Sequence, residues 1–205
     1  MRLNSIVVLI LTGSFAMSGF SQVPVSEQKV RAVLQREGDD QNPPTDGVMR
    51  LRDSLRMLGT DGEVTAVLLS LINKHKYAER RTPDYIVLNS SVIVLGAFGA
   101  NSANQLLSSV LTDPKVDSII RAGAARSLGQ IDPEGNKETL LGALNPTASD
   151  YYLIRVFAAE GLAKTKDDEA LRALERYGRD ERDQYVRQQF EKAGQEIRAN
   201  KLKPN

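Results

Sequence analysis

The chain has 205 residues, of which 27 are basic and 26 acidic, so its formal net charge is +1. This near balance gives little support to binding driven by counterion release, and we expect no nucleic-acid partner. The chain has no cysteine, which excludes disulfides and thiolate metal sites.

Residues 1–21 have the pattern of a secretory signal peptide. Arg2 supplies the positive start, residues 6–17 are mostly apolar, and small residues lead to Ser21. The apolar run is shorter than the roughly 20 residues that a membrane-spanning helix needs, although an uncleaved anchor remains the alternative. We therefore expect export, to a bacterial periplasm or to the outside of the cell.

Residues 22–47 are predicted to form an N-terminal cap. It begins with a helix in which Val30, Val33 and Leu34 make an apolar stripe. Residues 38–47 collect turn-forming residues without any apolar period, which predicts a loop. The three aspartates of this loop match no calcium-binding spacing, so we expect a solvated loop.

Residues 48–178 are predicted to form four helix pairs. The first pair has apolar residues at helical spacing, at positions 48, 51, 55 and 58 and then at 64, 67, 68, 71 and 72. The second pair starts with Thr82 at the N-cap and Pro83 at the first helical position, where a missing N–H costs nothing. Residues 86–95 are rich in β-branched side chains, but the repeat described next favours a helix.

A repeated phrase sets the register of these pairs. Residues 120–133 read Ile-Arg-Ala-Gly-Ala-Ala-Arg-Ser-Leu-Gly-Gln-Ile-Asp-Pro, and a weaker copy begins at Ile154, 34 residues later. Upstream, Leu95-Gly96 lies 33 residues before Leu128-Gly129, and Leu58-Gly59 lies 37 residues before Leu95-Gly96. A period of this length with helical patterning inside each unit is typical of a stacked α-helical array.

The third pair is predicted to place residues 117–130 in its first helix. Asp132, Pro133 and Glu134 suit the start of its second helix, as N-cap, first helical residue and acid at the positive helix end. The fourth pair spans about residues 150–177.

Residues 179–205 are predicted to form a C-terminal cap helix and tail. The helix, over residues 181–199, has a thin apolar stripe that includes Tyr185, Val186, Phe190 and Ile197. Its other faces are charged, as expected for the terminal element of an array.

The phrase Ile120-Arg121-x-x-Ala124-Ala125-x-Ser127-Leu128-Gly129-x-Ile131-Asp132-Pro133 resembles a HEAT repeat, especially the short subtype of phycobilisome-lyase-like HEAT proteins. The resemblance covers roughly residues 45–178 and is closest in the third unit. It implies an all-α, right-handed α-solenoid of about four HEAT-like helix pairs with capping helices at both ends. First helices would line the convex face and second helices the concave one. The resemblance also implies a scaffold that binds a protein or peptide partner.

Polar positions on the second helices build the predicted concave face. Four pairs at about 10 Å each, with helices near 20 Å long, give a face of about 800 Å². A standard interface takes about 800 Å² from each partner, so the face suits one partner. The candidate contact residues are Glu63, Ser70, Asn73, Asn104, Ser108, Lys137, Arg172, Glu175 and Arg176.

Lys74, Lys76, Arg80 and Arg81 form a basic connector between the first two pairs. It could hold an anionic lipid head group or an acidic partner. Neighbouring acids weaken its field, so a solvated connector is the simpler interpretation and membrane contact is the less favoured one.

His75 is the single histidine of the chain and lies between two lysines, so we expect it to be solvated rather than catalytic. No P-loop, zinc-protease or nucleophile-elbow pattern occurs. We therefore predict no catalytic residue, metal or cofactor. The alternatives to a protein-binding scaffold are a lyase-like protein that holds a small ligand and a structural accessory at the envelope surface.

Overall fold

The computed structural model describes residues 24–38, 45–146 and 151–203. The predicted signal peptide and most of the predicted 38–47 loop lie outside the described residues. Regular structure in the described part is helical throughout. None of the described helices is long and apolar enough to cross a membrane.

The helices follow one another with short connections. They are α1 (Glu27–Glu37), α2 (Thr45–Arg56), α3 (Asp61–His75), α4 (Pro83–Phe98), the 3-10 turn η1 (Asn101–Ala103), α5 (Asn104–Thr112), α6 (Ser118–Ile131), α7 (Lys137–Ala143), α8 (Tyr152–Leu162), α9 (Asp168–Asp180) and α10 (Gln184–Lys201). The predicted all-α architecture is confirmed, and the β-branched residues 86–95 lie inside α4.

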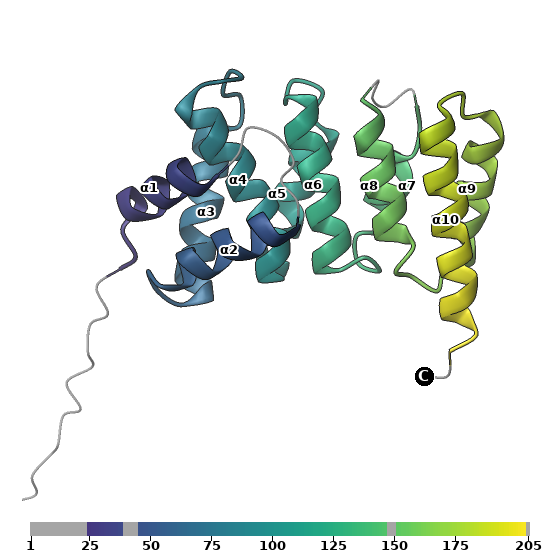
Figure 1. Cartoon of the computed structure of the whole chain (residues 1–205), viewed down its shortest axis with the longest axis horizontal. Coiled ribbons are helices and arrows are strands. Elements are labelled where there is room, and N and C mark those ends of the chain that lie inside the picture. The colour runs from purple at the N-terminus through teal and green to yellow at the C-terminus, as the bar shows by residue number, and fades with distance from the viewer. Residues whose placement is uncertain (1–23, 39–44, 147–150, 204–205) are drawn as a thin grey trace, which may run out of the picture.

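The helices stack in two layers. Figure 1 shows α4, α6, α8 and α10 side by side in a first layer, with α3, α5, α7 and α9 in a second layer behind them. Each first-layer helix packs on the next one, and each second-layer helix packs on the first-layer helix that follows it in the chain. The chain is therefore an α-solenoid of helix pairs, in which α10 takes the first-layer place next to α8.

Small residues let the first-layer helices approach closely. A Cβ atom added to Gly129 of α6 would lie 2.5 Å from the Cα atom of Gly161 in α8, so the two backbones touch. A Cβ added to Gly96 of α4 would lie 2.9 Å from the Cα of Ser127 in α6. The hydroxyl of Ser127 also donates to the carbonyl of Val92 at 2.8 Å. The backbones of α6 and α8 are therefore in direct contact at Gly129 and Gly161.

The first unit differs from the later ones. Figure 1 shows α1 and α2 lying across α4 instead of standing parallel to it. We call these two helices the N-terminal arm. Their buried stripes are Val30, Val33 and Leu34 in α1 and Val48, Leu51 and Leu55 in α2. Because the arm covers one side of α4 and helices of both layers cover others, eleven of the sixteen α4 residues are buried.

The predicted helix starts have two outcomes. The N–H of Tyr85 donates to the Thr82 hydroxyl at 3.2 Å, and Pro83 opens α4 as predicted. The prediction that Asp132 caps the next helix is wrong, because α7 begins only at Lys137. Asp132 instead accepts the N–H of Gly135 at 2.9 Å, which closes a turn. Asp-Pro pairs favour turns as well as helix starts, and here the turn is formed.

The apolar stripe of the last helix is shifted from the predicted one. Val186, Phe190 and Ile197 are buried as expected, and Ala193 joins them. Tyr185 is not part of this stripe, since 48% of its surface is exposed. Its ring instead makes an edge contact with Tyr152 at the start of α8, with centroids 6.0 Å apart.

Candidate binding surface

A groove of about 820 Å³ lies between α7 and α9, two neighbouring helices of the second layer. It is lined by Glu138, Leu141, Gly142, Glu169, Arg172, Ala173, Glu175, Arg176, Tyr177 and Arg179. Six of these ten residues are charged, and small residues of both helices leave the space between them. The structure thus brings Arg172, Glu175 and Arg176, three of the predicted contact residues, into one groove.

The amphipathic character of α9 explains this side of the groove. Ala170, Ala173 and Leu174 form the buried face of α9. Arg172 and Arg176 lie on its exposed face. The sequence prediction missed Arg179, although it follows Arg172 and Arg176 at helical spacing. It also missed the groove residues of α7, because nothing local shows which face of α7 turns toward α9.

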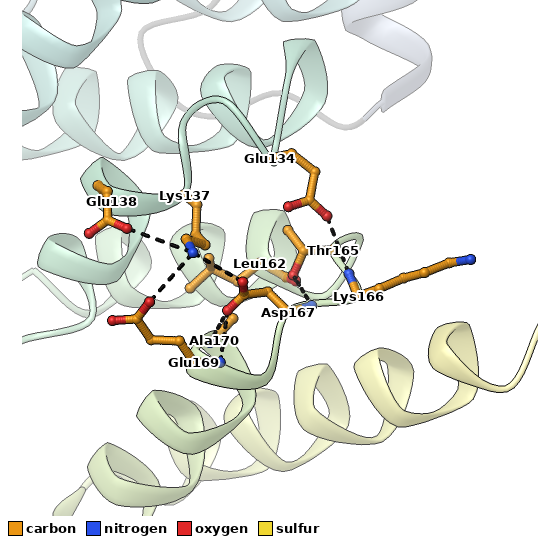
Figure 2. A network of polar contacts seen from close by, with 9 residues as sticks. All are labelled: Glu134, Lys137, Glu138, Leu162, Thr165, Lys166, Asp167, Glu169 and Ala170. Atoms are coloured by element: carbon orange, nitrogen blue, oxygen red, sulfur yellow. Dashed lines mark hydrogen bonds and ion pairs between the residues drawn. The ribbon is translucent and has the colours of Figure 1, made fainter. Parts of the chain in front are cut away.

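Lys137 holds one end of the groove together. Figure 2 shows its ammonium among three carboxylates, with Nζ 3.0 Å from Oδ2 of Asp167, 3.4 Å from Oε2 of Glu169 and 3.8 Å from Oε1 of Glu138. Asp167 also accepts the N–H groups of Glu169 and Ala170, at 2.8 and 2.9 Å, and so caps α9. The start of α7 is thereby tied to the start of α9.

The same contacts shift the pKa values of this pair. The hydrogen bond from the Ala170 N–H, followed by the Lys137 ammonium, lowers the pKa of the Asp167 carboxyl. Asp167 in turn raises the pKa of Lys137. Lys137 was predicted to contact a partner, and the structure places it in a link between two units of the array.

The arginines and the acids of the groove are engaged differently. Glu169 pairs with Lys137, and Glu175 pairs with Arg198 of α10. Among the described residues no ion pair engages Arg172 or Arg179, and the Arg176 guanidinium lies 4.7 Å from the Tyr177 ring centroid. The acids therefore have cations as neighbours, while the arginines keep donors for an incoming anionic group.

Three other predicted contact residues lie in the second layer away from the groove. Glu63 forms the capping box of α3, where its carboxylate accepts the Thr60 N–H at 3.0 Å. Asn73 donates to a carbonyl of its own helix at 3.2 Å. Asn104 accepts a hydrogen bond from Asn136 at 3.2 Å and so joins α5 to the turn before α7. These contacts stabilise the array itself.

Ser70 and Ser108 complete the predicted set. Ser70 is exposed on α3 and Ser108 is half-buried on α5. Neither lines the groove, so the structure does not join all the candidate residues into one site.

The basic connector is largely paired with acids. Lys74 pairs with Glu27 at 3.0 Å, Lys76 with Asp113 at 3.0 Å and Arg80 with Asp117 at 2.5 Å. These pairs tie the connector to α1 and to the turn before α6. Arg81 is exposed and has a φ of 67°, in the left-handed region that non-glycine residues rarely adopt. An anion bound here would compete with carboxylates that are already in place.

The expectation of a solvated His75 is wrong. Its side chain is 10% exposed, because α1 packs over the end of α3. Nε2 of His75 lies 2.9 Å from a guanidinium nitrogen of Arg31, and Nδ1 lies 3.3 Å from a carboxylate oxygen of Asp84. Arg31 also pairs with Asp84, and this pairing lowers the pKa of Asp84. The three side chains join α1, α3 and α4.

Residues 116–193 match a family model described as HEAT repeats. The matched segment contains α6 to α9, part of α10 and the whole groove between α7 and α9. No curated protein matches the chain. The match supports the HEAT-repeat interpretation, while the phycobilisome-lyase-like subtype stays a prediction.

Proposed function

We propose that this HEAT-repeat chain is an exported, non-enzymatic scaffold that binds an acidic segment of a partner protein in the groove between α7 and α9. HEAT arrays commonly act by presenting an extended surface to other proteins. The observation that carries the proposal is the gathering of Arg172, Arg176 and Arg179 along one groove whose acids already have cations beside them.

The charged lining also separates this function from the small-ligand alternative. Sites for small apolar molecules are lined mostly by apolar and aromatic side chains. Here Leu141, Ala173 and Tyr177 are outnumbered by six charged residues. The chain also lacks tryptophan, so absorbance above 300 nm in the purified protein would reveal a bound chromophore and favour the alternative.

The test measures binding of a fluorescently labelled, glutamate-rich peptide by anisotropy. Reversing two charges in the double variant Arg172→Glu/Arg176→Glu should weaken binding by about tenfold, which corresponds to about 1.4 kcal/mol. The matched control, Lys29→Glu/Arg50→Glu, makes the same change of net charge at exposed positions of the N-terminal arm and should leave the affinity within about twofold.

Equal losses in the two double variants would show that only net charge matters, and would contradict a site in the groove. Photo-crosslinking from position 172 in the native envelope fraction then identifies the partner. Recovery of the protein in the cytoplasmic fraction would contradict the exported part of the proposal.

A further inference from the structure

The repeat register shows which face of the first layer the N-terminal arm covers. The 33-residue offset between Leu95 and Leu128 places Ile93 of α4 at the position of Arg126 in α6. The 34-residue offset between the two copies of the repeated phrase places Glu160 of α8 at the same position. At these three equivalent positions the exposure of the residue rises along the array: Ile93 is 2% exposed, Arg126 is half-buried and Glu160 is exposed.

The cover formed by the arm ends at α6. A guanidinium nitrogen of Arg126 donates to the hydroxyl of Thr45, the first residue of α2, at 3.3 Å. Figure 1 shows the arm in front of α4 and, in the described part of the chain, no helix in front of α8 or α10. The face that receives two amphipathic helices at one end of the array thus continues uncovered toward the other end.

The uncovered face has an apolar centre. Phe157 of α8 is half-buried, and by the same repeat offsets it is equivalent to Ser90 of α4. The Arg126 guanidinium lies 5.7 Å from the centroid of the Phe157 ring. Leu153, one turn before Phe157 on α8, is also half-buried, and so is Ile119, the residue of α6 that lies 34 residues before Leu153. These side chains can supply the apolar contact that a helix laid across the layer needs.

Charged side chains around this centre are already partly desolvated. Burial raises the pKa of Glu160 and lowers the pKa of Lys164, although both residues have exposed surface. A partner that covers such groups removes less hydration than one that covers fully solvated charges. Lys192 pairs with Glu196 at 3.9 Å, and Arg126 faces Glu160, so Lys164 supplies an excess positive charge.

We propose that the face formed by α6, α8 and α10 binds an amphipathic, acidic helix of a partner protein, which lies across the first layer as the arm lies across α4. Its apolar stripe packs on Phe157, and a carboxylate on its flank pairs with Lys164. This surface is independent of the groove between α7 and α9, which belongs to the other layer.

A designed peptide tests the proposal directly. A helix of about 18 residues is about 27 Å long and spans three helices at about 10 Å spacing. The probe carries leucines at helical spacing, glutamates on both flanks and one tryptophan. Because the protein has no tryptophan, the change in tryptophan emission on titration reports the peptide alone. The control peptide has lysines in place of the glutamates.

The glutamate peptide should bind the wild-type protein at least about tenfold more tightly than the lysine peptide does. In the Arg172→Glu/Arg176→Glu background, which removes the arginines of the groove, the preference should persist, and adding Lys164→Glu/Lys192→Glu should abolish it. Since Lys164 also donates to the Gly129 carbonyl at 2.7 Å, circular dichroism checks the fold of the combined variant. The single variant Lys192→Glu, on an exposed side chain, and a photo-crosslinker at position 160 give the same test without that risk.

Equal affinity for the two peptides, or an unchanged preference in the Lys192→Glu variant and no crosslink from position 160, would overturn the proposal. Loss of binding only in the Arg172→Glu/Arg176→Glu variant would move the helix to the groove and also overturn it. A dimer of the protein that Lys192→Glu dissociates would assign this face to a second copy instead of a partner helix.

Discussion

Replacing Gly129 by alanine tests the close packing that positions both candidate surfaces. The added Cβ would lie 2.5 Å from the Cα and 3.3 Å from the N of Gly161. Carbon atoms pack best at about 3.5–4.0 Å, so α6 and α8 would have to separate by about 1 Å. The obstructing atoms are backbone, and no rotamer change can relieve the contact.

Two opposing effects set the size of the change. Alanine stabilises a helix interior by about 1 kcal/mol relative to glycine. Overpacking costs about 1–3 kcal/mol, and a contact with backbone belongs at the upper end of this range. We expect the free energy of unfolding to fall by about 2 kcal/mol, because an overpacking cost of about 3 kcal/mol exceeds the gain of about 1 kcal/mol from alanine. The seam between α6 and α8 lies in the middle of the array. For a chain of this length that loss lowers the Tm by about 4–8 °C.

Gly142→Ala is the matched control. Gly142 lies in α7, and a Cβ added there would meet nothing within 4 Å. Only the helix-propensity gain should remain, and the variant should be more stable than the wild type by up to about 1 kcal/mol. Thermal and urea unfolding followed by far-UV circular dichroism measure both variants. A Gly129→Ala protein that is as stable as Gly142→Ala would refute the backbone-contact argument.

Three further predictions test other links in the array. Glu181→Ala should lower the free energy of unfolding by about 3 kcal/mol. The side chain of Arg155 is 8% exposed and lies 3.0 Å from the Glu181 carboxylate, so the variant removes this carboxylate from a buried guanidinium. Urea unfolding that matches the wild type would contradict this. Thr60→Ala removes the capping box of α3 and should cost about 1 kcal/mol, measured as a lower urea midpoint, whereas an unchanged midpoint would show that the cap is dispensable. Asp113 has a pKa of about 2 against an ordinary 3.8, first because it accepts the Lys115 N–H, so its contribution to stability is complete above about pH 4 and is lost as the pH falls toward 2. Asp113→Asn should therefore flatten the loss of Tm between pH 4 and pH 2, and an identical slope in both proteins would count against this role.

Much of the fold could be predicted from local features of the sequence. The 33- and 34-residue offsets predicted that residues 86–95 are helical, and Thr82 and Pro83 marked the start of α4. Such signals work because helix starts and apolar stripes depend on residues within one or two turns of each other. Asp132 shows their limit, since the same two residues, Asp-Pro, can close a turn or open a helix.

The candidate groove was predictable on one side only. Arg172 and Arg176 follow from the amphipathic pattern of α9, whose buried face is defined by Ala170 and Leu174. The opposite wall depends on how α7 packs beside α9, and Lys137 fixes that arrangement through acids about thirty residues away. No periodicity within α7 encodes this contact.

The sequence by itself determined that the chain is an array of helix pairs, since the period and the apolar stripes are properties of neighbouring residues. Only the tertiary structure decided that the N-terminal arm lies across α4, that it covers His75, and that its cover ends at Arg126. These features rest on contacts between residues that are far apart in the chain, such as Arg31 with Asp84 and Arg126 with Thr45. The free energy of such contacts depends on how whole helices pack, and so does the position of the surface left open for a partner.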